Sequence, residues 1–141
     1  MQNPQQIKEK VEVRYRTFLI LWVMMLVSIA LFLGLALGVK GANAVGNPTL
    51  SLALVGTAFA MVVVSFLIKQ RIVRQAIAKR DVGSLRSGYI VGYALCESAA
   101  LFGLLDHFVT GSNYNYFSFA IAALGMLLHF PKKDHVRAAT A

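Results

Sequence analysis

Long runs of apolar residues dominate the chain and are separated by short polar segments. The runs cover residues 18–39, 50–68, 87–109 and 114–130. About 20 apolar residues in a helix rise roughly 30 Å, which is the thickness of the hydrocarbon layer of a bilayer. Inside that layer backbone polar groups must bond within the protein, which favours helices. The pattern predicts an all-α integral membrane protein with four transmembrane helices in a single domain, 1–141.

The helical pattern extends beyond two of these runs. Residues 5–16 have apolar positions near helical spacing, which predicts a helix leading into the first span. The second run meets no helix breaker before residues 81–84, so its helix is expected to continue roughly two to three turns past Lys69. The polar tail after Pro131 is expected to be frayed and solvated.

Basic residues indicate the orientation of the chain. Thirteen of the 14 Lys and Arg residues precede the first span, lie in the loop 69–86 or follow the fourth span, whereas Lys40 lies on the other side. The positive-inside rule then places both termini and this loop in the cytoplasm, and we expect the bacterial inner membrane. Ala42-Asn43-Ala44 resembles a signal cleavage site, but the preceding apolar run is longer than a signal peptide's core, which favours an uncleaved anchor.

Composition excludes several classes of protein. Hydrophobic residues make up 57% of the chain and charged residues 14%, whereas soluble domains carry about 25% charged residues. An ordinary soluble enzyme is therefore excluded, and a single cysteine, Cys96, cannot form an internal disulfide. The net charge of +8 is explained by topology and by attraction to anionic lipid head groups, so no nucleic-acid partner is expected.

Glu97 is the acidic residue nearest to the centre of a span. It lies ten residues after Ser87 and twelve before Val109. A charge at that depth costs on the order of 3 kcal/mol, so an intramembrane carboxyl is a candidate functional group. Burial disfavours the ionised form of a carboxyl, which favours a group able to exchange a proton. Tyr93 shares its helical face, and both Tyr93 and the adjacent Ser98 are candidate hydrogen-bond partners.

Small residues at a spacing of four predict close contacts between helices. The candidate packing residues are Gly34, Gly38, Gly88, Gly92, Ala99 and Gly103. Such rows let helices approach closely in lipid, where small residues are enriched at helix interfaces. Four of the six lie in the same run as Glu97, so the helix carrying this carboxyl is expected to pack closely against its neighbours.

The third run is similar to a known family. Arg86 precedes Glu97 by eleven residues, and Glu97 is followed by Ser98-Ala99-Ala100-Leu101-Phe102-Gly103-Leu104-Leu105. Together with the polar segment Ala78-Lys79-Arg80-Asp81, this pattern resembles the loop and C-terminal helix of the rotary ATP synthase c subunit (proteolipid). The resemblance covers about residues 50–108. It implies that Glu97 is a proton- or sodium-carrying carboxylate with Ser98 beside it, next to a cytoplasmic loop.

Catalytic and cofactor patterns are not apparent in the sequence. It shows no nucleophile paired with a base, no Gly-rich phosphate loop and no Cys/His metal spacing, so we expect no enzymatic activity, no cofactor and no metal site. His107 and His129 are expected at opposite faces of the bilayer, which disfavours a bis-histidine haem. Asp106 and His107 are expected to form a solvated pair at the outer interface.

These features favour a small non-enzymatic subunit of a larger membrane assembly. In this interpretation Glu97 exchanges protons, and the partners are the lipid bilayer and other membrane protein subunits, of the same or different chains. In the alternative, the chain is a purely structural accessory subunit and Glu97 is a polar contact between helices. A small transporter acting alone is a third possibility, although four short helices offer a narrow path.

Overall fold

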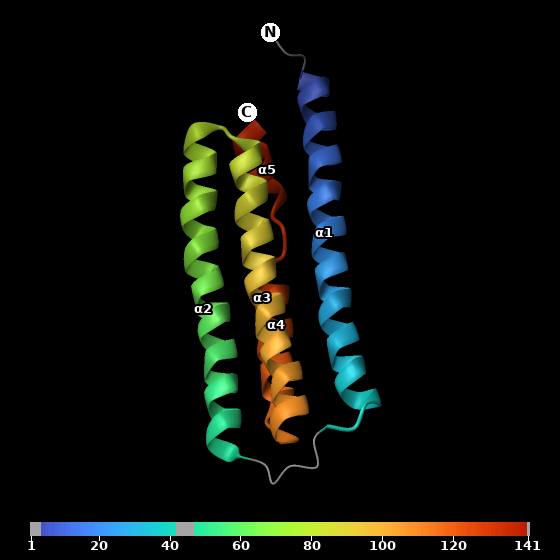
Figure 1. The fold of residues 1–141 in the computed structure, drawn as a ribbon. Helices are drawn as coiled ribbons and strands as arrows, with labels where there is room; N and C mark the ends of the chain where they lie inside the picture. The colour runs from blue at the N-terminus through green and yellow to red at the C-terminus, as the bar shows by residue number, and fades with distance from the viewer. Residues whose placement is uncertain (1–3, 42–46, 141) are drawn as a thin grey trace.

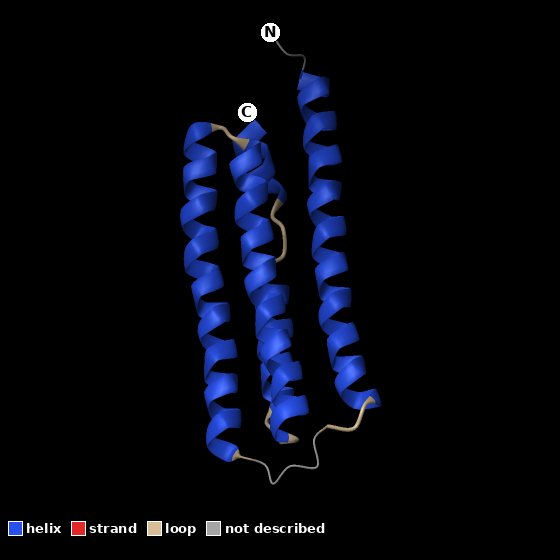
Figure 2. Cartoon of the chain, viewed as in Figure 1, coloured by secondary structure: helices blue, strands red, loops and turns tan. Residues whose placement is uncertain are grey.

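The computed structural model describes residues 4–41 and 47–140 as helices joined by turns and short connections (Figure 2). The helices are α1 (Pro4–Gly38), α2 (Pro48–Lys79), α3 (Val82–Thr110), α4 (Asn115–Leu128) and α5 (Lys133–Thr140). Helices α1 to α4 alternate in direction, so both ends of the described chain lie at the same end of the molecule as the α2–α3 turn (Figure 1). The all-α prediction is confirmed for the described residues, and the cleavage-like residues 42–44 lie outside them.

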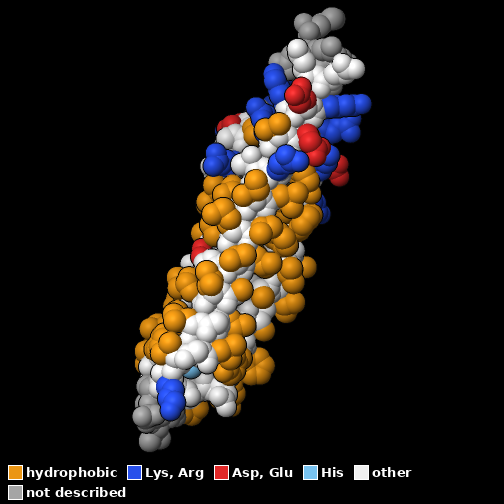
Figure 3. All heavy atoms as spheres, turned by 90° about the vertical axis from the view of Figure 1, so that its right-hand side faces the viewer, with side chains coloured by type: hydrophobic (Ala, Val, Ile, Leu, Met, Phe, Trp, Pro, Cys, Tyr) orange, Lys and Arg blue, Asp and Glu red, His pale blue; other side chains and the backbone are white. Residues whose placement is uncertain are grey.

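Within the described part of the chain, three helices are long and apolar enough to cross a membrane. Helices α1, α2 and α3 have 35, 32 and 29 residues, so each exceeds the roughly 30 Å of a hydrocarbon layer at 1.5 Å per residue. The helical lead-in before the first span and the continuation of the second span past Lys69 are both confirmed, because α1 and α2 are unbroken through these segments. On the face drawn in Figure 3, apolar side chains form a belt over the middle of the molecule, and most charged side chains gather at one end of it.

Helix α4 is shorter than the expected span of 114–130. It has 14 residues and ends at Leu128, so it rises about 21 Å. Proline has no N–H and disfavours helical backbone in the residue before it, which explains why the helix does not reach Pro131. The predicted fourth helix, 114–130, was therefore too long.

The backbone that follows α4 finds its hydrogen-bond partners within the bundle. The N–H of Phe130 donates to the carbonyl of Leu127 at 3.2 Å. The ammonium group of Lys69 donates to the carbonyl of His129 at 3.4 Å, and the N–H of Lys132 donates to the hydroxyl of Tyr89 at 3.2 Å. Non-helical backbone is thus tolerated here because the rest of the bundle supplies its hydrogen bonds.

The tail after Pro131 is ordered, contrary to the expectation of a frayed end. It forms α5, in which Val136 and Ala139 are buried. These two side chains are three residues apart and so share one helical face, which packs onto the bundle. The ring of His135 adds a hydrogen bond, with Nδ1 lying 2.9 Å from the hydroxyl of Tyr89.

Helix α1 contacts the bundle along one narrow stripe. Its buried apolar residues are Val11, Phe18, Ile29 and Ala36. Their separations of seven, eleven and seven residues place them on one side of a helix. The other faces of α1 carry exposed apolar side chains such as Met24, which suit a lipid environment.

Two glycines of the sequence pattern give a matched test of helix packing. A Cβ at position 88 would lie 2.9 Å from Cγ2 of Ile72, whereas a Cβ at position 34 meets nothing within 4 Å. We expect Gly88→Ala to lower the free energy of unfolding by about 1–3 kcal/mol, because the β-branched Ile72 has little freedom to move. Gly34→Ala should raise it by about 0.5–1 kcal/mol through helix propensity. Urea unfolding in mild detergent measures both, and equal effects would contradict the packing described.

The docking of α5 should depend on pH through His135. Burial, followed by the charges of Lys132 and Lys69, holds the pKa of His135 below its usual range, and Asp134 opposes this in part. A protonated Nδ1 also cannot accept the hydroxyl hydrogen of Tyr89. When α5 is undocked, His135 takes up a proton near pH 6.5. Docking is therefore at full strength above about pH 6.5, and it weakens as the pH falls through the lower pKa that His135 has in the docked helix.

Hydrogen exchange measures this effect directly. Protection factors of residues 133–140, corrected for intrinsic exchange rates, should fall between about pH 7.5 and about pH 5.5, which brackets the titration of histidine. The variant His135→Gln has no titrating group at this position and should show no such fall. A wild-type protection pattern that is the same at both pH values would contradict the role of His135.

Candidate functional site

Glu97 lies near the middle of α3, at the contact with α1. Its Oε1 accepts a hydrogen bond from the hydroxyl of Ser28, which belongs to α1. The side chain is partly exposed rather than enclosed. The carboxyl therefore joins two helices at mid-length while one side of it stays accessible from outside the bundle.

The other two candidate proton-site residues do not complete this group. The hydroxyl of Ser98 donates to the carbonyl of Ala94 in its own helix, at 2.8 Å. The hydroxyl of Tyr93 is buried and has no hydrogen-bond partner among the described residues. Ser28 was missed at the sequence level, although it is the only hydroxyl side chain in the run 18–39.

Four of the six candidate packing residues are buried, and the three glycines among them lie at tight helix contacts. Gly88, Gly92, Ala99 and Gly103 are buried in α3. A Cβ at position 92 would lie 2.8 Å from the His129 ring, and one at position 103 would lie 3.0 Å from Cβ of Ser118. Gly34 and Gly38 are exposed, and a Cβ at either position meets nothing within 4 Å. They do not pack against another helix of this chain, because α1 turns a different face toward the bundle.

A second carboxyl, Asp106, is fully buried near the C-terminal end of α3. This end of α3 lies at the opposite end of the bundle from the start of α1 (Figure 1). Its Oδ2 accepts a hydrogen bond from the hydroxyl of Ser51 in α2, at 2.6 Å. Its Oδ1 accepts one from Thr110, one turn further along α3, also at 2.6 Å. The expectation of a solvated Asp106–His107 pair was wrong, because successive residues of a helix point in different directions. The sequence did offer a signal for the Ser51–Asp106 contact, because both residues lie near adjoining ends of two helices that are antiparallel.

His107 instead ties three segments together at this end. Its Nε2 lies 2.8 Å from the carbonyl of Val39, so this nitrogen carries the hydrogen and donates it. Its Nδ1 then accepts from the side-chain amide of Asn115 in α4, at 2.9 Å. The end of α1 is thereby linked to α3 and α4.

A third polar group lies between α2, α3 and α4, nearer the basic end. His129 is fully buried, and its Nδ1 lies 2.7 Å from the carbonyl of Gly125. Its Nε2 lies 3.2 Å from the hydroxyl of Ser65, and the sulfur of Cys96 is 3.7 Å from that hydroxyl. Gly92 leaves the space that the histidine ring occupies.

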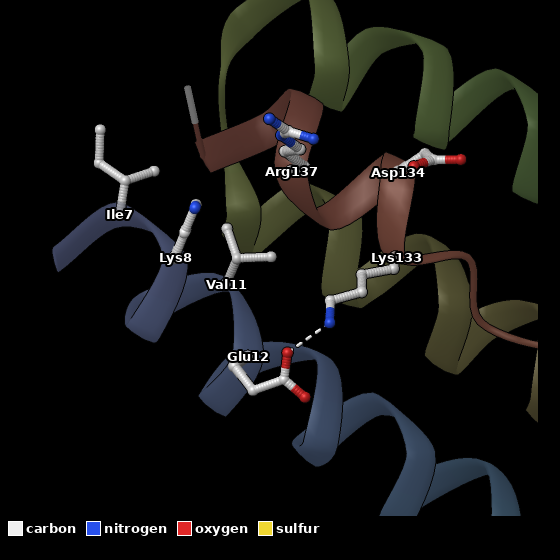
Figure 4. A pocket seen from close by; sticks show the side chains of 7 residues that line it. All are labelled: Ile7, Lys8, Val11, Glu12, Lys133, Asp134 and Arg137. Carbon is white, nitrogen blue, oxygen red and sulfur yellow. Dashed lines mark hydrogen bonds and ion pairs between the residues drawn. The ribbon is translucent and has the colours of Figure 1, made fainter. Parts of the chain in front are cut away.

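A surface groove of about 510 Å³ separates α1 from α5 (Figure 4). Lys133 and Glu12 form an ion pair across it, and both side chains are exposed. Exposed ion pairs contribute little to stability, roughly 0–1 kcal/mol. The remaining charged residues at the groove are Lys8, Asp134 and Arg137, so both cations and carboxylates line it.

These polar groups can exchange protons or join helices, and nothing in their arrangement points to a metal centre. Within residues 5–41 and 47–140, no three His, Cys, Asp or Glu side chains come together in a way that could hold a metal ion. Comparison with known proteins found no matching family model, no curated protein and no solved structure.

Asp106 gives a test of the buried polar contacts. We expect Asp106→Ala to lower the free energy of unfolding by about 2–3 kcal/mol, because it leaves the buried hydroxyl of Ser51 without its acceptor. Asp106→Asn keeps an acceptor oxygen and should cost less. The exposed Asp134→Ala is the control and should stay within about 0.5 kcal/mol of wild type. Unfolding in mild detergent measures all three, and a neutral Asp106→Ala would contradict the contact described.

Proposed function

We propose that the protein is an integral membrane protein in which α1 to α4 cross the bilayer. The apolar belt and the collection of basic side chains at one end support this (Figure 3). In this orientation both termini and the α2–α3 turn are cytoplasmic, because 13 of the 14 Lys and Arg residues then lie on that side. The composition and orientation suit the inner membrane of a bacterium.

The short α4 crosses with the help of the segment that follows it. The helix rises about 21 Å, and the connection from α4 to α5 continues toward the basic end of the bundle (Figure 1), which extends the crossing toward the roughly 30 Å of a hydrocarbon layer. His129 and Pro131 are buried, and the neighbouring helices satisfy the backbone of this segment. Non-helical backbone at membrane depth is tolerated where it is enclosed by protein in this way.

Within the membrane the protein acts as a small non-enzymatic subunit of a larger assembly, with Glu97 as a proton-exchanging carboxyl. The observation that carries this proposal is the place of Glu97 between α1 and α3. It lies at mid-length, is partly exposed and has one hydroxyl partner, Ser28. An ionisable side chain at this depth is costly in free energy, and one hydrogen bond compensates only part of that cost, so its presence favours a functional role.

The resemblance to the rotary c subunit agrees with this arrangement in one respect. It implies an antiparallel hairpin whose second helix carries the carboxylate, and α2 and α3 form such a hairpin with Glu97 in α3. Ser28 belongs to α1, which lies outside the resembling segment 50–108. In this chain a third helix therefore supplies the partner of the carboxyl.

An open face on α1 supports assembly with another chain. Gly34 and Gly38 stand one turn apart with no neighbour, and small residues at this spacing permit close approach of a second helix in lipid. The partner is then another membrane protein subunit, of the same or a different chain.

A purely structural role is the second candidate, and the contacts of α1 favour it. Besides the Ser28–Glu97 hydrogen bond, α1 is joined to the bundle by Nε1 of Trp22, which donates to the carbonyl of Met126 at 2.8 Å. In this reading the hydrogen bond to Glu97 is one of several polar contacts that hold a loosely packed helix in place.

Glu97→Gln separates the two candidates, because an amide can accept from Ser28 but cannot exchange a proton. Under the proposed function, this variant keeps its assembly partners in mild detergent, and its proton flux in proteoliposomes falls to that of protein-free vesicles. A carbodiimide should label Glu97 of the wild type. Ser28→Ala keeps the carboxyl and should retain flux.

Unchanged proton flux in Glu97→Gln would sink the proton-exchange proposal. Loss of assembly in Glu97→Ala, with Glu97→Gln behaving as wild type in every assay, would establish the structural role instead.

A further inference from the structure

A groove with an unbalanced positive charge lies between α2 and the connection from α4 to α5. It has a volume of about 400 Å³. Lys69 and Arg74 of α2 line it on one side and Lys132 on the other. Among the described residues that line it, none is acidic. Two segments far apart in sequence therefore bring three cations together.

Among the described residues, none of these three cations forms an ion pair. The ion pair between Glu12 and Lys133 lies at the other groove. The ammonium of Lys69 is half-buried, and its neighbours are the carbonyl of His129 at 3.4 Å and the ring of Tyr89 at 4.4 Å. Both are partial negative charges, so the positive charge is only partly compensated.

The titration of His135, which also lines the groove, reflects the same positive charge. After burial, the charges of Lys132 and Lys69 are the causes that lower the pKa of His135, and Asp134 opposes them. The hydroxyl of Tyr89 is the other titratable group facing His135. An anion in the groove would relieve the repulsion among these like charges.

The groove is apolar at its other end. Phe66, Leu128 and Phe130 line it there, and the latter two are among the exposed large hydrophobic side chains. Along α2, Lys69 lies about 4.5 Å and Arg74 about 12 Å beyond Phe66, so both basic side chains lie on the cytoplasmic side of it. The polarity thus changes along the groove in the same direction as in a phospholipid, from phosphate to acyl chain.

We propose that this groove binds an anionic phospholipid of the cytoplasmic leaflet. Lys69, Arg74 and Lys132 contact its phosphate, and the acyl chains lie along Phe66, Leu128 and Phe130. Basic pockets between membrane helices on the cytoplasmic side suit anionic head groups. The groove between α1 and α5 is less suited, because Glu12 and Asp134 offset its cations. This inference rests on the proposed membrane insertion.

The test compares two charge-matched double variants of the full chain in mild detergent. Arg74→Gln with Lys132→Gln removes two exposed cations from the groove, and Arg71→Gln with Lys79→Gln removes two exposed cations from outside it. Native mass spectrometry measures retained phosphatidylglycerol and phosphatidylcholine during lipid titration. Circular dichroism and size-exclusion chromatography check that both variants are folded.

Phosphatidylglycerol should bind the wild type more tightly than phosphatidylcholine. Each basic residue near a head group contributes roughly fivefold, so the groove variant should bind phosphatidylglycerol about 25-fold more weakly. The control variant should lose less than about threefold, because Arg71 and Lys79 do not line the groove and salt screens their exposed charges. Soluble glycerophosphate lacks acyl chains and should bind far more weakly than the lipid.

Equal losses in the two variants would overturn the site, as would equal binding of the two lipids. Binding of glycerophosphate as tight as that of the lipid would overturn the role of the apolar end. Alkaline carbonate extraction of native membranes tests membrane insertion separately from lipid binding in the groove. A wild type that is extracted refutes membrane insertion, whereas one that stays inserted but lacks lipid preference refutes the groove alone.

Discussion

The close approach of α2 and α4 to α3 is the constraint on which the rest of the structure depends. In lipid, apolar side chains gain little from leaving their solvent, so helices associate through close packing and hydrogen bonds. The small residues of α3 permit this packing: Gly88 lies against Ile72 of α2, and Gly103 lies against Ser118 of α4. Gly92 has a further role, because its missing side chain leaves room for the ring of His129.

Close packing also decides where polar groups can be placed. Asp106 is accommodated because α2 brings the hydroxyl of Ser51 within 2.6 Å of it. His129 is accommodated because its nitrogens meet Ser65 and the carbonyl of Gly125. In a water-poor environment each of these groups would be costly without a partner, so a polar residue on one helix requires a matching residue on the next.

Helix α1 is held in a different way, and this bears on both proposed roles of Glu97. Its contact with the bundle is a narrow apolar stripe supplemented by polar contacts from Trp22 and Ser28. Each such hydrogen bond contributes about 1 kcal/mol, so loss of the one to Glu97 would weaken the attachment of α1 by about that amount. The proposed proton exchange at Glu97 would therefore be coupled to the position of α1.

The amino-acid pattern by itself determined the four apolar helices, their approximate bounds and the end of the molecule that is basic, but it did not predict α5. These follow from local properties: the length of apolar runs, the spacing of small residues and the charges between them. The early end of α4 was also readable in principle, since Pro131 cannot continue a helix.

Tertiary structure alone decided which residues meet. The hydroxyl that binds Glu97 comes from Ser28, sixty-nine positions away, rather than from its neighbours Tyr93 and Ser98. Likewise, Gly34 and Gly38 follow the same small-residue rule as Gly88, yet they face outward. A periodic pattern shows that a helix has a small face or a polar position, whereas the rotation and depth of each helix against its neighbours determine which contacts form, and these depend on the packing of the whole bundle.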